Sequence, residues 1–231
     1  MGLFRRRLVI KTLCVLLIII AVFVLSDVVL KSVRVIQKSR FTIVLDAGHG
    51  GVDGGAVGFN GTVEKTINLE YVKIMKEKLE ARGFKVFLIR ANDDGLYSVF
   101  DKNKKSSDMK KRISLIKKYN PNLVLSVHMN SYKDPSVKGV FTYFRKGDEQ
   151  GKECANLIQK TIKKYCGIKQ EFAKVGDYYI LNESYYTAVL IECGFLSNPQ
   201  EEKLLNDAVY KNKITDAICD AVLLYSGLTQ I

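Results

Sequence analysis

Three apolar segments of this 231-residue chain each lead into a residue that can bind a metal or transfer a proton, namely His49, His128 and Glu192. The two histidines are the only ones in the sequence. Open α/β sheets place their ligands just beyond the carboxyl ends of parallel strands. If the three segments are parallel strands of one sheet, two imidazoles and a carboxylate therefore meet at one edge.

This set of side chains is typical of a catalytic zinc site. Such a site takes three protein ligands of the His and Glu type and leaves one position for water. His49, His128 and one carboxylate supply that number, and a second carboxylate then fits the general base. Glu64 and Glu192 are the two candidates. Glu64 opens a predicted helix after the His49 loop, and Glu192 ends a buried strand, where burial raises the pKa of a carboxyl group.

Each residue also has a purely structural interpretation. A single histidine is most often a core or surface residue, and Glu64 is an acid that complements the dipole of its helix. Glu192 lies between two apolar triplets, where a carboxylate without a partner is costly. Cys193 is an alternative nucleophile with His128. The alternation of side chains along a strand argues against it, because it places Cys193 on the face opposite Glu192.

The elements that position these residues follow from the hydrophobic periodicity. Strands are predicted at 41–45, 85–90, 123–127, 139–144, 177–181 and 188–192. Helices are predicted at 62–82, 108–119, 149–166, 199–206 and 209–225. This alternation predicts a single α/β domain with a mostly parallel, twisted sheet and helices on both faces. Between the first strand and helix, residues 48–61 contain seven glycines, so this backbone can approach a ligand closely.

The first forty residues form a separate segment. Arg5, Arg6 and Arg7 precede an apolar run over residues 13–25, the pattern of an export signal or signal-anchor. The arginines place the following domain outside the cytoplasm. No clear cleavage site follows, which favours an uncleaved membrane anchor. We therefore divide the chain into a signal-anchor or signal peptide with a basic linker (1–40, the linker at 31–40) and a catalytic domain (41–231).

The charge distribution excludes one class of partner. The formal net charge is +12, but residues 1–40 carry eight Lys or Arg and a single acid, which leaves +5 for the rest of the chain. A nucleic-acid-binding surface needs a concentrated basic stripe with interleaved aromatics, and the sequence has none. A mildly basic surface is instead compatible with an anionic polymer such as a cell-wall glycan.

Four motifs in order, over about residues 41–226, resemble the zinc-dependent N-acetylmuramoyl-L-alanine amidases of bacterial cell walls. They are Asp46-Ala47-Gly48-His49-Gly50-Gly51, Glu64-Lys65 with Asn68-Leu69, Ser126-Val127-His128-Met129-Asn130, and Leu190-Ile191-Glu192-Cys193-Gly194-Phe195-Leu196-Ser197-Asn198. The resemblance implies one Zn²⁺ per chain bound by His49, Glu64 and His128, with Glu192 as the catalytic carboxylate. An exported catalytic domain without wall-binding repeats is most similar to the germination-specific members, which act on spore cortex peptidoglycan and prepare muramic δ-lactam.

The resemblance also implies substrate contacts by Arg112, Asn130 and Asn182. The sequence departs from the family pattern at Lys117, Asn122, Asn182 and Thr187. The lack of a cation at position 182 predicts weaker binding of an anionic stem peptide, or metal binding that depends on an activating protein partner. Two alternatives stay open. One is a zinc carboxypeptidase, which would need Arg112 or Arg90 for a terminal carboxylate, and the other is a non-catalytic wall-binding protein.

Overall fold

The computed structural model describes residues 2–227. Residue 1 and residues 228–231 lie outside the described part, as do the side chains of residues 3–10, 12 and 34–40. The helices are α1 (Gly2–Arg40), α2 (Glu64–Ala81), α3 (Lys104–Tyr119), α4 (Glu149–Cys166), α5 (Tyr179–Glu183), α6 (Pro199–Asn206) and α7 (Ala208–Tyr225). The strands are β1 (Thr42–Ala47), β2 (Lys85–Leu88), β3 (Leu123–Asn130), β4 (Phe141–Phe144), β5 (Lys174–Val175) and β6 (Ala188–Phe195).

The strands form one sheet in the order β2-β1-β3-β6-β4-β5. β2, β1, β3 and β6 run parallel, whereas β4 pairs antiparallel with β6 and parallel with β5. The two central strands, β3 and β6, are buried along most of their length. Buried parallel strands read as continuous apolar runs, which is why they are readable in the sequence. The predicted α/β class with a mostly parallel sheet is confirmed.

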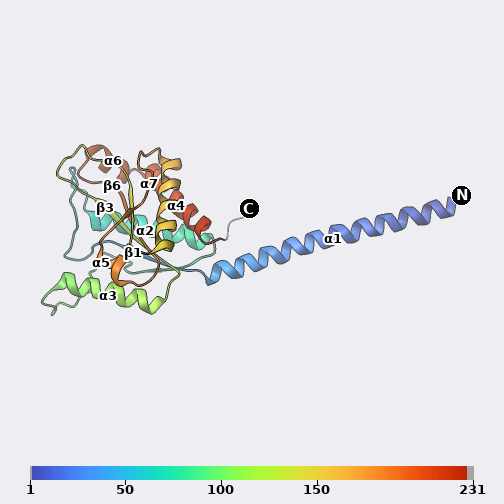
Figure 1. The fold of residues 1–231 in the computed structure, drawn as a ribbon, viewed down its shortest axis with the longest axis horizontal. Helices are drawn as coiled ribbons and strands as arrows, with labels where there is room; N and C mark the ends of the chain where they lie inside the picture. Colours follow the sequence, from blue (N-terminus) through green and yellow to red (C-terminus); the bar gives the residue numbers. More distant parts are fainter. Residues whose placement is uncertain (1, 228–231) are drawn as a thin grey trace.

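Helices cover both faces of the sheet, as the sequence predicts (Figure 1). Successive strand residues point to opposite faces, so β1 sends Ile43 and Leu45 to one face and Val44 to the other. The larger core lies under α2, α4 and α7. The smaller core lies under α3 and α5.

The strand predicted at 177–181 is wrong, because this segment contains the short helix α5. Its aromatic and apolar residues mimic a strand pattern, but Ile180 and Leu181 both pack into the smaller core. Adjacent residues of a strand would face opposite sides of a sheet. A turn is required instead, and the N–H groups of Leu181 and Asn182 close it on the carbonyl of Tyr178 at 3.0 Å each. The two-residue strand β5 was not predicted.

Several element boundaries also differ from the prediction, and two of them concern helices α1 and α3. The linker predicted at 31–40 is helical, since α1 continues to Arg40 through residues that include no proline or glycine. Helix α3 begins at Lys104 rather than at residue 108, and the side chain of Asn103 caps it by accepting a hydrogen bond from the N–H of Ser106 at 2.9 Å.

Helix α1 extends away from the rest of the chain (Figure 1). Its segment Leu13–Val33 has a mean hydropathy of 3.1 and none of it is buried, so it is long and apolar enough to cross a membrane. Directly after α1, Phe41 packs edge-on against Phe84 and Tyr225, with ring centroids 5.7 and 6.5 Å away. The helix therefore joins the domain at the edge where the parallel strands begin.

Candidate active site

The opposite edge of the sheet, where the parallel strands end, carries the polar residues singled out in the sequence. His128 on β3 is the register partner of Glu192 on β6, so both side chains project from the same face. His49 lies two residues beyond the end of β1. Glu64 is the first residue of α2, which follows the His49 loop.

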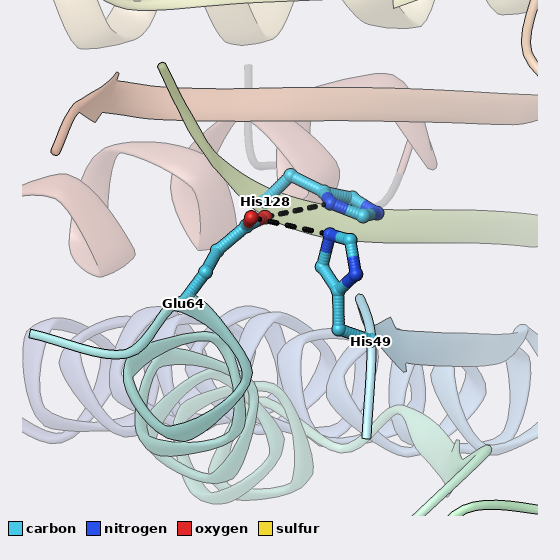
Figure 2. Close-up of side chains that lie close together, drawn as sticks. All are labelled: His49, Glu64 and His128. Carbon is cyan, nitrogen blue, oxygen red and sulfur yellow. Dashed lines mark hydrogen bonds and ion pairs between the residues drawn. The ribbon is translucent and has the colours of Figure 1, made fainter. Parts of the chain in front are cut away.

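His49, Glu64 and His128 form a cluster whose ligand atoms all lie within 4.8 Å of one another. Glu64 is central in it (Figure 2): its Oε2 lies 3.1 Å from His49 Nε2, and its Oε1 lies 3.0 Å from His128 Nδ1. The two imidazole rings are nearly perpendicular, with centroids 5.0 Å apart. Two imidazole nitrogens and one carboxylate oxygen are the donor set of a catalytic zinc site, and this spacing fits a single ion.

The Glu64 carboxylate is 4 % exposed and well supplied with donors. It accepts hydrogen bonds from the N–H of Ala56 at 2.8 Å, the N–H of Met129 at 3.2 Å and the side chain of Asn68 at 3.3 Å. Burial raises its pKa, but the hydrogen bonds and charges of His128 and His49 outweigh burial and hold the pKa of Glu64 well below its usual range. Glu64 is therefore ionised and fixed in place.

The backbone of the His49 loop is bent so that two ligands can approach it. His49 itself has a φ of 62°, a left-handed conformation that is uncommon outside glycine. A Cβ added at Gly48 would lie 2.1 Å from the His128 ring, and one added at Gly55 would lie 2.4 Å from Glu64 Oε2. These two glycines leave the space that His128 and Glu64 occupy.

Asp53 is a residue of the site that the sequence analysis missed. Its Oδ1 lies 3.0 Å from Nδ1 of His49, on the side of the ring away from Glu64. Nδ1 itself has no hydrogen-bond partner among the described residues, so Asp53 acts on the ring through its charge. The sequence feature that could have identified Asp53 is its position, four residues after His49 within the glycine-rich loop.

Glu192 has the properties of a proton acceptor. It is 8 % exposed, and its buried Oε2 has no hydrogen-bond partner among the described residues. Burial raises the pKa of Glu192 to about 7, although His128 opposes the shift. A carboxyl with a pKa near the working pH is suited to take up and release a proton. Cys193 points to the other face and is fully buried in the larger core, where burial raises its pKa.

The three residues predicted to contact substrate lie in different surroundings. Arg112 is 2 % exposed and is paired with Asp46 and Asp108 below the His49 loop. Asn130 ends β3, where its Oδ1 accepts from the N–H of Ser131 at 2.8 Å. Asn182 lies on α5 and donates to Oδ1 of Asp177 at 2.7 Å.

A cleft of about 320 Å³ opens over His49 and His128. Its walls include side chains that the sequence analysis did not single out, from the loop before α3, from α3 and from the start of α5: Tyr97, Lys105, Met109, Tyr178 and Tyr179. Tyr178, which directly precedes α5, and Tyr179, its first residue, were missed because that segment was predicted as a strand. The cleft lies between α3 and α5, next to the metal-ligand cluster.

Residues 43–223 match the Amidase_3 family, described as N-acetylmuramoyl-L-alanine amidase. The chain is 32% identical over 186 residues to the N-acetylmuramoyl-L-alanine amidase LytC of Bacillus subtilis, covering 80% of this chain but only 35% of that relative. It is 30% identical over 187 residues to the germination-specific N-acetylmuramoyl-L-alanine amidase of the same organism, covering 79% of this chain and 78% of that relative.

A solved structure supports the same assignment. The CwlD amidase from Clostridioides difficile, solved in complex with the GerS lipoprotein, is 35% identical and superposes with a TM-score of 0.78 over 82% of this chain and 100% of that chain. The family match spans the sheet, the His49 loop and the strand that carries Glu192. The chain therefore belongs to the N-acetylmuramoyl-L-alanine amidase family, whose members act on peptidoglycan.

Proposed function

We propose that this protein is a zinc-dependent amidase that hydrolyses the bond between N-acetylmuramic acid and L-alanine in spore cortex peptidoglycan, as a step towards muramic δ-lactam. The observation that carries the zinc dependence is the His49–Glu64–His128 cluster, with all ligand atoms within 4.8 Å. The similarity to the germination-specific amidase of Bacillus subtilis and to the CwlD amidase supports the cortex as substrate.

In this proposal His49, Glu64 and His128 would hold one zinc ion. When bound, zinc supplies a Lewis acid that polarises the amide carbonyl and makes water more acidic. Glu192 takes the proton of the attacking water and delivers it to the nitrogen of L-alanine as the carbon–nitrogen bond breaks. The products are a free lactyl carboxylate and a free amino group. The raised pKa of Glu192, about 7, suits it to both transfers.

The cleft supports a peptide or glycan substrate beside this cluster. We propose Asn130, two residues beyond His128, and Asn182, on the helix α5 that begins at Tyr179, as substrate contacts. The structure does not favour a carboxypeptidase that reads a terminal carboxylate through Arg112 or Arg90. Both guanidinium groups are buried, and their hydrogen bonds go to groups of the protein itself.

The proposed setting is the outer side of the cytoplasmic membrane, on the cortex side of the forespore, with residues 1–40 as the anchor and residues 41–231 as the catalytic domain. The segment Leu13–Val33 supports it by its length and hydropathy. We also propose an activating protein partner, since the CwlD amidase was solved in complex with the GerS lipoprotein.

The test uses the full chain purified in a mild detergent, with zinc measured by elemental analysis and cortex peptidoglycan as substrate. Mass spectrometry is expected to find muropeptides that have lost their stem peptide and stem peptides with a free L-alanine amino group. His49→Ala and His128→Ala are each expected to lose zinc and turnover while the circular dichroism spectrum stays that of the wild type. A zinc content near one per chain in either variant would show that the ligand assignment is wrong.

The partner is tested separately by a zinc titration of the same purified chain with no added protein. Weak zinc binding that becomes tight on addition of a lipoprotein partner is the expected result. Stoichiometric binding together with full cortex cleavage by the chain alone would remove the need for a partner.

A further inference from the structure

Arg90 is a buried cation that the proposed mechanism does not use. It lies just beyond β2, is 3 % exposed, and donates four hydrogen bonds. Nε donates to the carbonyl of Ala47 at 2.9 Å and Nη1 to that of Asn92 at 2.9 Å, while Nη2 donates to those of Gly48 at 2.9 Å and Lys65 at 2.7 Å. All four acceptors are main-chain carbonyls, and these hydrogen bonds include no carboxylate.

Three of the four acceptors belong to the two segments that carry metal ligands. Ala47 and Gly48 directly precede His49, and Lys65 directly follows Glu64. One planar guanidinium therefore connects the first turn of α2 to the start of the His49 loop. A guanidinium presents its N–H groups in a fixed fork, so it fixes both the distance and the orientation between the two segments.

The hydrogen bonds of Arg90 offset the free-energy cost of burying its charge. Burying a charged group is expensive unless it is fully hydrogen-bonded, and burial lowers the pKa of Arg90. The neighbouring backbone is adapted to the side chain, because a Cβ added at Gly50 would lie 3.1 Å from Cδ of Arg90. Arg112 holds the same loop from another side, with Nη1 donating to the carbonyl of Ala47 at 2.8 Å and Nη2 to that of His49.

The loop needs such a connection because its sequence does not favour one conformation. Seven glycines between positions 48 and 61 raise the entropy lost on ordering the loop. His49 is held at a φ of 62°, which the surrounding contacts must maintain. Without the connection to Lys65, the loop would be ordered only when the metal binds. The entropy lost in ordering His49 against Glu64 would then reduce the observed free energy of metal binding.

We propose that Arg90 is a positioning residue, which holds the His49 loop against the first turn of α2 so that His49 and Glu64 are arranged for metal binding before the metal arrives. This inference rests on the proposed zinc dependence. It assigns Arg90 no contact with the substrate.

The test replaces Arg90 by methionine in the full chain and measures the zinc dissociation constant by competition with a chromogenic chelator. Removing a residue that orients metal ligands weakens metal affinity by about 10–100-fold, and we expect a loss in that range. At saturating zinc, kcat is expected to recover to within a few-fold of the wild type, since the ligands and Glu192 are unchanged. Arg90→Lys keeps the charge but loses the fork, so its affinity is expected to lie between the two.

Gln159→Met is the matched control. Gln159 on α4 is also fully buried and makes a comparable set of hydrogen bonds. It accepts from the N–H and hydroxyl groups of Thr142 and donates to the carbonyls of Val140 and Gln170, none of which belongs to the His49 loop. This control is expected to lower the melting temperature of the metal-free protein while leaving the zinc dissociation constant within about twofold of the wild type, as the affinity loss belongs to ligand-orienting residues.

The outcomes are distinguishable. Tight zinc binding by the wild type with an unchanged constant in Arg90→Met and Arg90→Lys would overturn the role of Arg90 and leave the zinc amidase standing. Equal weakening by Arg90→Met and Gln159→Met would also overturn it, because the effect would then be general destabilisation. If Arg90→Met does not fold, the zinc dissociation constant of Arg90→Lys is compared with that of Gln159→Met, and that comparison tests the role of Arg90. A wild type that binds no zinc either alone or with a lipoprotein partner would overturn the proposed function itself.

Discussion

Replacing Arg112 by methionine is expected to destabilise the fold rather than to weaken substrate binding. The guanidinium is 2 % exposed and pairs with Asp46, which is itself 2 % exposed, and with Asp108 on the same helix. It also donates to the carbonyls of Ala47 and His49. The variant would leave a buried carboxylate without its cation.

The expected loss follows from that burial. Removing one partner of a buried ion pair costs about 3–5 kcal/mol, because the other charge stays buried and uncompensated. For a domain of this size each kcal/mol lowers the melting temperature by about 2–4 °C. The variant is therefore expected to melt about 6–20 °C below the wild type at pH 7.

The difference in melting temperature between the wild type and Arg112→Met is expected to be smaller at pH 5 than at pH 7. In the wild type, burial raises the pKa of Asp46, but Arg112 and Ser126 outweigh burial and hold that pKa below its usual value. Asp46 therefore stays ionised in the folded and unfolded states between pH 7 and 5. In the wild type it does not make the free energy of unfolding depend on pH in this range. Without Arg112, burial prevails and the folded pKa lies above the unfolded one. The folded variant then binds a proton that the unfolded chain lacks, so lowering the pH by two units restores at most about 2.7 kcal/mol.

Thermal melts of the metal-free full chain followed by circular dichroism at pH 7 and pH 5 measure both effects. Lys163→Met is the control, since Lys163 pairs with Glu171 at 3.1 Å on the surface, where the loss of an ion pair changes stability by less than about 1 kcal/mol. An unchanged melting temperature in Arg112→Met, combined with a raised KM for cortex peptidoglycan, would refute this reasoning. Arg112 would then be the substrate contact that the sequence predicts.

Two further substitutions test the site. Glu192→Gln is expected to retain zinc and lose about 10²–10⁴-fold in kcat, because an amide cannot take the proton. Elemental analysis measures the zinc content, and cortex turnover measures kcat. Activity within a few-fold of the wild type would mean that another residue is the general base. Gly48→Ala is expected to displace the His128 ring, since the added methyl group would lie 2.1 Å from it. A zinc titration is then expected to show weaker binding than in the wild type, and unchanged affinity would mean that the loop shifts to accommodate the methyl group.

The strands that place His128 and Glu192 are readable in the sequence because both are central and buried on two faces. Burial makes them continuous apolar runs, and each run ends at the polar residue that it positions. Helix α4 is predicted with its observed bounds for a similar reason. Asp148 caps its first turn and Gly167 ends it in a left-handed conformation, so both ends carry local signals.

The parts that sequence reasoning missed depend on contacts between distant segments. Helix α5 follows from the need to bury Ile180 and Leu181 on one face, which no local pattern expresses. Arg90 is the last residue of the strand predicted at 85–90, and only the fold reveals that its acceptors include the carbonyls of Ala47, Gly48 and Lys65. Every residue has a main-chain carbonyl whatever its side chain. The residue types in the sequence therefore do not predict which carbonyls accept hydrogen bonds from Arg90.

The attachment point of α1 constrains how the site meets its substrate. Phe41 fixes the end of α1 against Phe84 and Tyr225, at the edge where β1 begins, whereas His49 follows the end of that strand. The six residues of β1 separate the two edges by about 20 Å, at about 3.3 Å per residue. With α1 in the membrane, as proposed, the chain therefore enters the domain at one edge of the sheet, and the cleft opens at the opposite edge.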